Sequence, residues 1–513
     1  MRVLRIIGAV GLVLVLAGLF VKPVHEPVSV PVGEPMLLSS QASHEILDEG
    51  RVLFFNMQLE AAEQRFNELA ERADGEVAAS FHLALTTLLK SVITDDEVYY
   101  DRFDERYDRL SDALDEAEDS LWKTYLSAEA RLMRTIMLAK QNRVIRAALT
   151  ARGAHNRFQR AASSEHPDFA EAYKGVGLFN IALGSLPSGY QRVLSILGYR
   201  GSIEQGLAQL ERAAAESQYN QEEATAYLAF IDVILKYEPA HAVERTRLLA
   251  EQYPESPLFG WIRAFILLED RQVHRAREAA TQAVQRGQQP GYFFVDYAEY
   301  YMGEALFRLN RFGDAATYYR RYMARHKGPA LRALAHLRTG HALEMEGRRD
   351  EALIFYRRVR AERDFDADEM AYREAQRRLS TPLDRDEKHL LRGINAFYAG
   401  QYNLSRALLQ SLLGSTTEGV AARARYYVAQ SQYAQGRFDV AAEHFREARA
   451  NPGRQVDGIA PWSAFYLGQI QQRRGNIQDA EELYKQALAY STPFDYHQWL
   501  EQRVAVAREA YNK

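Results

Sequence analysis

The sequence predicts an all-α protein, a right-handed superhelical solenoid of helical hairpins that follows an N-terminal signal or anchor segment. Three observations support this prediction. A two-helix unit recurs through the second half of the chain. The 513 residues exceed what one compact core accommodates, which favours several domains or a solenoid. An apolar run follows two arginines at the N-terminus.

The clearest copy of the recurring unit extends from Tyr426 to Ala448. Gly436 can adopt the left-handed conformation that ends a first helix, and Asp439 can cap a second one. The apolar residues of the second helix are spaced four and three apart, so they share one helix face. They are Ala441, Phe445 and Ala448.

This spacing resembles the tetratricopeptide repeat, a helix-turn-helix of about 34 residues that stacks into a solenoid. Three further copies contain Gly303, Asn310, Phe312, Ala315, Tyr319 and Tyr322; Gly340, Gly347, Ala352 and Tyr356; and Gly468, Gly475, Ile477, Ala480, Tyr484 and Ala487. A weaker copy, with Ser405 at the position of the small alanine, contains Gly393, Gly400, Tyr402 and Leu409. A degenerate copy without the turn glycine contains Ala264, Ala276, Ala280 and Ala283. The resemblance implies stacked helical hairpins.

Residues 1–21 are predicted to be a signal peptide or a transmembrane anchor. Arg2 and Arg5 precede an apolar run from Ile6 to Val21. Cleavage after Ala17 and an uncleaved span of about 16 to 19 apolar residues both remain open. Lipidation is not expected, because Leu19 occupies the position that needs a cysteine. The arginines would keep the N-terminus cytoplasmic and place the rest outside.

Residues 22–38 form a proline-rich linker, followed by an N-terminal helical domain over 39–240 and a repeat array over 241–513. The linker carries prolines four residues apart, at Pro23, Pro27, Pro31 and Pro35. Proline at this density favours an extended arm. A semi-rigid spacer and a plain disordered linker both fit the composition.

Two neighbouring stretches of the N-terminal domain carry opposite charge. Residues 95–119 are strongly acidic, whereas residues 131–160 contain eight arginines and lysines and no acid. Because short connections make consecutive helices antiparallel neighbours, we expect the two stretches to face each other. The net charge of −4 and this acidic neighbour argue against a nucleic-acid partner.

A glycine-rich block near residue 190 resembles one specific family, tetratricopeptide repeat protein 39 with its fungal relatives named for inclusion-body clearance. The resemblance rests on Gly177-Leu178-Phe179-Asn180, Leu186-Pro187, Leu197-Gly198-Tyr199-Arg200-Gly201 and Gly206-Leu207. Ser188 and Ser202 depart from the family's second proline and its aspartate. The similar layout extends over residues 45–513. The resemblance implies an all-helical repeat fold, no catalytic residue, and a cytosolic or mitochondrial outer-membrane location, which conflicts with the export-like N-terminus.

No sequence motif indicates catalysis, a cofactor or a metal. The absence of cysteine excludes disulfides and thiolate sites, and the histidines show no ligand spacing. Neither a phosphate-binding loop nor a nucleophile elbow occurs. The sequence therefore predicts a non-enzyme without cofactors.

The first helices of such repeats line the concave face, so we expect a protein-binding groove there. Aromatic rings interspersed with amides suit peptide recognition. The candidate groove residues are Trp261, Phe265, Tyr297, Tyr300, Tyr426, Gln430, Trp462, Phe465 and Gln469. For each of them, packing between repeats is an equal alternative. The lysine and asparagine of chaperone-tail clamps are absent from these positions.

Three functional hypotheses follow. The first is a non-catalytic scaffold for protein partners in the cell envelope, anchored in the inner membrane or exported to the periplasm. The second, from the family resemblance, is a regulatory protein of the mitochondrial outer-membrane type. The third is an envelope enzyme with a fold-assembled site. The oligomeric state is left open.

Replacing Arg2 and Arg5 with acidic residues is expected to disturb export or orientation, because the flanking positive charge sets the topology. A reporter fused after Pro35 measures this. A reporter that stays extracytoplasmic in the variant would contradict the anchor.

Overall fold

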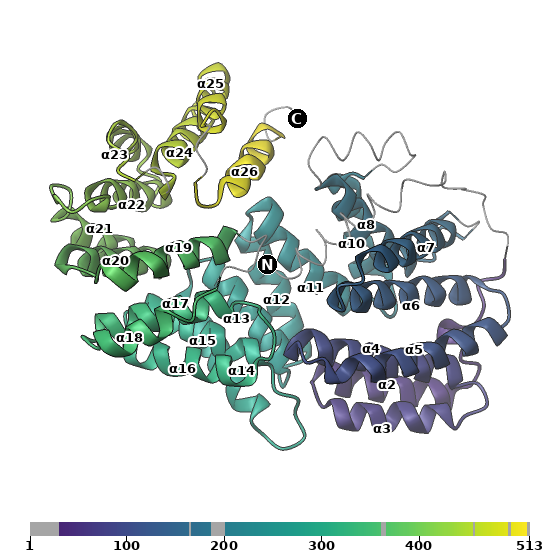
Figure 1. The fold of residues 1–513 in the computed structure, drawn as a ribbon. Helices are drawn as coiled ribbons and strands as arrows, with labels where there is room; N and C mark the ends of the chain where they lie inside the picture. Colours follow the sequence, from purple (N-terminus) through teal and green to yellow (C-terminus); the bar gives the residue numbers. More distant parts are fainter. Residues whose placement is uncertain are drawn as a thin grey trace. The chain divides into compact units, whose positions relative to one another are not determined.

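The computed structural model describes residues 30–163, 166–185, 201–360, 366–454, 457–490 and 494–509. These residues form helices joined by short turns and contain no strand (Figure 1). The all-helical prediction is therefore confirmed, whereas the handedness of the superhelix stays a prediction. The predicted signal or anchor segment, most of the proline-rich linker and the break around Leu186-Pro187 lie outside the described residues.

The chain divides into two compact units. Unit 1 comprises residues 1–230, 244–259 and 285–295, and unit 2 comprises residues 231–243, 260–284 and 296–513. Between residues 231 and 295 the chain thus alternates between the units, whereas the sequence predicts a single division after residue 240.

Unit 1 is a row of helical hairpins. It contains the 3-10 turn η1 (Pro35–Leu37), α2 (Gln41–Phe55), α3 (Leu59–Ala70), α4 (Glu76–Thr94), α5 (Val98–Glu116), α6 (Leu121–Lys140), α7 (Val144–Ala162), α8 (Ala172–Gly184), α10 (Ile203–Glu216) and most of α11 (Gln221–Ile231). Parts of α12 (Pro239–Gln252), α13 (Pro257–Glu269) and α14 (Val273–Gly287) belong to each unit.

Unit 2 contains the remaining hairpins and one π-helical turn. Its elements are η2 (Asp232–Lys236), α15 (Asp296–Arg308), α16 (Phe312–Arg325), α17 (Arg332–Met345), α18 (Arg349–Tyr356), α19 (Asp366–Ser380), α20 (Arg385–Tyr398), α21 (Tyr402–Gln410), α22 (Val420–Ala434), α23 (Phe438–Ala450), α24 (Ile459–Arg473), α25 (Ile477–Leu488) and α26 (His497–Glu509). α19 and α26 stand outside the regular hairpins.

One residue frame recurs in the hairpins of both units. A small buried residue in the first helix is followed 7 residues later by a left-handed turn residue and 16 residues later by a fully buried residue of the second helix. The triplets are Gly50, Met57 and Phe66; Thr135, Asn142 and Ala151; Ala264, Arg271 and Ala280; Gly303, Asn310 and Tyr319; Gly340, Gly347 and Tyr356; Gly393, Gly400 and Leu409; Ala429, Gly436 and Phe445; and Gly468, Gly475 and Tyr484.

The frame confirms the expected repeats of the second half and adds a full copy over α6 and α7. Sequence inspection missed that copy because Asn142, with φ of 58°, occupies the turn instead of glycine. In the degenerate copy the left-handed turn position is occupied by Arg271, with φ of 59°. Left-handed conformations cost non-glycine residues only a modest energy, so the packing residues define the repeat better than the glycine does.

The glycine-rich block brings two helices into backbone contact. A Cβ added to Gly177 of α8 would lie 2.7 Å from the carbonyl oxygen of Gly206 in α10, and the reverse distance is 2.6 Å. The absence of a side chain at both glycines therefore allows the close packing of α8 on α10.

One described helix, α4, is long and apolar enough to cross a membrane. Of its apolar window, 78% is buried inside the structure. This burial is typical of a core helix of a folded domain.

Replacing Ala441 with leucine is expected to lower the stability of its repeat by about 1–3 kcal/mol, because the fully buried position has no room for a larger side chain. Thermal unfolding measures the loss. Ala434→Leu, at an exposed position of the preceding helix, is the control. Equal melting temperatures for both variants would show that the frame is misassigned.

Candidate functional site

The predicted groove residues separate into buried and partly exposed groups. Tyr297, Tyr300, Gln430 and Phe465 are buried. Phe465 is 1% exposed and lies 5.9 Å, between ring centroids, from Tyr484 of the next helix. Tyr300 lies 5.6 Å from Tyr319 in the same way. The expectation that these rings form an accessible surface is therefore corrected: the position three before the small residue packs against the second helix.

The other five predicted residues remain partly exposed. They are Trp261, Phe265, Tyr426, Trp462 and Gln469. Trp261 stacks on Tyr297 at 5.1 Å, and Gln469 accepts a hydrogen bond of 3.0 Å from the Tyr433 hydroxyl. Their part in binding stays a prediction.

A second ring follows two of the predicted positions. Tyr301 and Tyr427 directly follow Tyr300 and Tyr426, and each pair of rings meets edge to face. Both second rings are partly buried: Tyr301 lies 5.4 Å from Phe265 and Tyr427 lies 5.3 Å from Phe397, between ring centroids. They pack between neighbouring first helices and leave a partly exposed aromatic surface there. The recurring Tyr-Tyr dipeptide is the sequence signal for this second ring.

Tyr398 is the centre of this exposed aromatic surface in unit 2. Its side chain is 38% exposed, and its hydroxyl lies 3.2 Å from that of Tyr427. The Arg308 guanidinium lies 5.5 Å from the Tyr398 ring centroid. Arg308 also donates a hydrogen bond of 2.6 Å to the carbonyl of Leu268. We call Tyr398, Tyr427 and Arg308 the Tyr398 surface.

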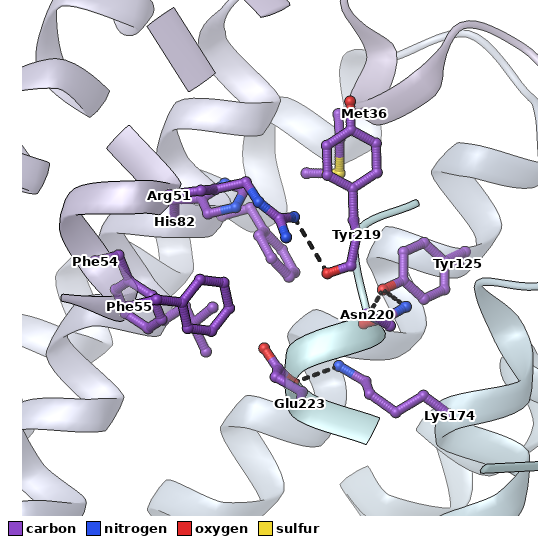
Figure 2. A pocket seen from close by; sticks show the side chains of 12 residues that line it. Met36, Arg51, Phe54, Phe55, His82, Tyr125, Lys174, Tyr219, Asn220 and Glu223 are labelled. Atoms are coloured by element: carbon purple, nitrogen blue, oxygen red, sulfur yellow. Dashed lines mark hydrogen bonds and ion pairs between the residues drawn. The ribbon is translucent and has the colours of Figure 1, made fainter. Parts of the chain in front are cut away.

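Unit 1 contains a buried polar centre (Figure 2). The Lys174 ammonium of α8 lies 3.1 Å from Glu129 of α6 and 2.7 Å from Glu223 of α11. Both Lys174 and Glu129 are almost fully buried. Burial lowers the pKa of Lys174, but the two carboxylates outweigh it and hold that pKa well above its usual value.

Hydrogen bonds extend this centre to the turn before α11. Glu171 accepts bonds from the backbone N–H groups of Gln218 and Tyr219, at 2.6 and 3.2 Å. Asn220 donates to Glu171 at 2.6 Å and to the Tyr125 hydroxyl at 2.8 Å. A turn with this many side-chain acceptors is fixed by tertiary contacts rather than by local sequence.

The polar centre leaves no room for a substrate. The side chains around it enclose about 20 Å³, which holds about one water molecule. No group of three or more histidine, cysteine or acidic side chains within the described ranges could hold a metal ion. The arrangement is suited to joining α6, α8 and α11.

Comparisons with known proteins place the chain among helical-repeat proteins. Residues 115–319 match the family Iml2/Tetratricopeptide repeat protein 39, and residues 300–367 and 390–454 match the tetratricopeptide repeat. The family resemblance is thus confirmed, over a shorter range than the expected residues 45–513. A search of curated proteins gives no match.

Several solved structures of helical-repeat proteins are similar at low identity. A Rap protein complexed with competence and sporulation factor is 13% identical, with 86% of this chain and 100% of that chain covered and a TM-score of 0.35. The human IFIT1 dimer with m7Gppp-AAAA is 14% identical, with 88% and 96% covered and a TM-score of 0.31. Yeast Tom70 is 12% identical, with 92% and 96% covered and a TM-score of 0.26. TM-scores this low give these proteins no bearing on function.

Glu129 is expected to make the protein less stable as the pH rises from about 5 to about 7. Burial raises its pKa to about 7, and Lys174 only partly offsets this. The folded state then holds a proton that the unfolded state has released, so stability is present at low pH and lost as the pH rises through the folded pKa.

Glu129→Gln should flatten this part of the stability curve, as measured by thermal unfolding at constant ionic strength. Glu223→Gln, which removes the other carboxylate on Lys174, is the comparison and should keep the slope but move it to lower pH, because the Glu223 charge helps to raise the pKa of Glu129. An unchanged slope in Glu129→Gln would contradict the assignment.

Proposed function

Because the chain is built from tetratricopeptide repeats, we propose that it is a non-catalytic scaffold that binds protein partners through the Tyr398 surface. One observation carries the proposal: the Tyr398 ring is 38% exposed, and it is bordered by the partly buried Tyr427 and Arg308. Tyrosine and arginine are enriched where partners bind. The net charge of −4 supports protein partners rather than nucleic acid.

We further propose that the scaffold is held at a membrane of the cell envelope, with its folded part outside the cytoplasm. The support is the sequence alone: two arginines, an apolar run and a proline-rich arm before residue 39. An inner-membrane anchor and export to the periplasm are the two forms of this proposal.

The match of residues 115–319 favours a second candidate, a regulatory protein of the mitochondrial outer-membrane type. Protease treatment of intact bacterial cells distinguishes the two. Protection that is lost when the outer membrane is opened supports the envelope scaffold. Digestion that begins only after both membranes are broken would contradict it.

Replacing Tyr398 with alanine is expected to reduce partner capture strongly and to leave the melting temperature nearly unchanged, because this ring is exposed. Truncating a central interface aromatic costs about 2 kcal/mol or more of binding. Capture is measured by cross-linking in cells and mass spectrometry, against the unaltered chain.

The matched control is Tyr372→Ala in α19, because that side chain is 39% exposed, against 38% for Tyr398. Phe465→Ala is a second control and should lower the melting temperature, because its ring is buried. Capture that falls equally in the Tyr372 variant, or not at all in the Tyr398 variant, would place the binding surface elsewhere.

A further inference from the structure

The most exposed large apolar side chains of the described residues lie in the first turns of α5 and α7. Ile145 is 72% exposed, Val98 67% and Leu149 57%. Two contacts with α6 show how α5 and α7 are aligned along its axis: Asp104 of α5 pairs with Arg134, and Gly153 of α7 packs against Arg131. Because α5 and α7 are antiparallel to α6, residues before Asp104 and before Gly153 lie toward the C-terminal end of α6. Val98 and Ile145 therefore lie at about the same position along the α6 axis.

α5 carries an acidic stripe on its exposed side. Asp101, Glu105, Asp108 and Asp112 are exposed, have spacing that puts them on one helix face, and pair with no basic group of the described chain. The three arginines of α5 reach carboxylates of other helices: Arg102 lies 3.7 Å and Arg106 2.9 Å from Glu63, and Arg109 lies 2.7 Å from Glu76. The acidic stripe is therefore not neutralised within its own helix.

α7 carries the opposite charge and has no acidic residue. Arg146 and Arg160 are exposed, and neither forms an ion pair with a described side chain. Burial lowers the pKa of Arg157, and the nearby positive charges of Arg131 and Arg160 lower it further. The expectation that the basic stretch faces the acidic one is met by α6, through Arg134 with Asp104 and Lys140 with Asp95. Asp115 of α5 also acts on Arg157 of α7 and raises its pKa against these effects.

We propose that this face binds a second copy of the chain, with α5 of each copy on α7 of the other. α5 and α7 are both antiparallel to α6, so they run parallel to each other. A two-fold axis parallel to the helices places each acidic stripe on a basic helix. A rotation about this axis does not change a residue's position along the helices, so Val98 of one copy also lies opposite Ile145 of the other.

A second copy fits this face better than the alternatives. An axis across the helices would place acid on acid, which costs several kcal/mol per like-charged contact. An anionic membrane that binds the arginines of α7 would be repelled by the neighbouring acidic stripe of α5. Only a partner with the same two stripes and the same apolar end complements all three features.

The absence of cysteine from the chain allows a specific cross-linking test. Full-length Val98→Cys and Ile145→Cys chains are mixed and oxidised, and covalent dimers are measured on gels. The mixture should cross-link well and each variant alone poorly, because only residues 98 and 145 are opposed. Val440→Cys, at an exposed position of unit 2, is the control. Equal yields in all samples, or none in the mixture, would overturn the proposal.

Charge reversal gives an independent measurement on the same full-length chain. Arg146→Glu with Arg160→Glu should weaken dimerisation about tenfold or more. Adding Asp101→Arg with Asp112→Arg exchanges the two stripes and should restore it. These side chains are exposed, so the melting temperature should stay constant in every variant. If the chain with all four substitutions does not dimerise, the pairing of α5 with α7 is refuted. That outcome is expected if α7 alone binds an acidic partner or membrane.

Discussion

The whole array depends on the contact between a second-helix side chain and a small residue of the first helix. A Cβ added to Gly303 would lie 2.8 Å from the ring of Tyr319, and one added to Gly468 would lie 2.6 Å from the ring of Tyr484. Real Cβ atoms do not come this close, so the missing side chain allows the ring to lie on the helix backbone. The hydroxyls are also satisfied: Tyr319 donates to Glu304 at 2.5 Å, and Tyr484 donates to Gln472 at 2.6 Å. A ring closes the hairpins whose second-helix residue is aromatic, and Ala151, Ala280 or Leu409 takes its place in the others.

This contact also decides which side chains remain for binding. With the second-helix ring on the small residue, the aromatic three positions before it packs beside that ring, as Phe465 does on Tyr484. The next residue is then turned by about 100° and packs toward a neighbouring first helix, as Tyr427 does on Phe397. Sequence periodicity identified the repeated face, but it could not separate buried from accessible rings, because adjacent tyrosines both fall within the broad apolar arc of a first helix. For this reason the hairpins of the second half were predictable and the accessible residues were not.

The N-terminal half was less predictable because its interactions are not periodic. The ion pair of Lys174 with Glu129 joins residues 45 positions apart, and neither residue belongs to a motif. A buried charge is tolerated only where the fold places an opposite charge beside it. The centre therefore depends on how α6, α8 and α11 pack together, which the sequence does not show. The repeat over α6 and α7 was missed for a related reason: tertiary packing holds Asn142 in the left-handed turn that glycine marks elsewhere.

The same packing explains why charge gathers on the outer side of α5 and α7. Buried positions of both helices are filled by residues such as Phe103, Leu110 and Phe158. Charged residues must therefore occupy the exposed sides, and they are free to vary in sign without affecting the core. Mixed signs would serve solubility equally well, yet α7 has no acidic residue, and four exposed acids share one face of α5, whose exposed arginines Arg102 and Arg109 pair with other helices. Segregation of this kind repels like charge within each helix, a cost that folding alone does not require. A complementary surface on a binding partner would offset that cost, and the exposed Val98 and Ile145 at the end of both stripes are where such a partner gains apolar contact.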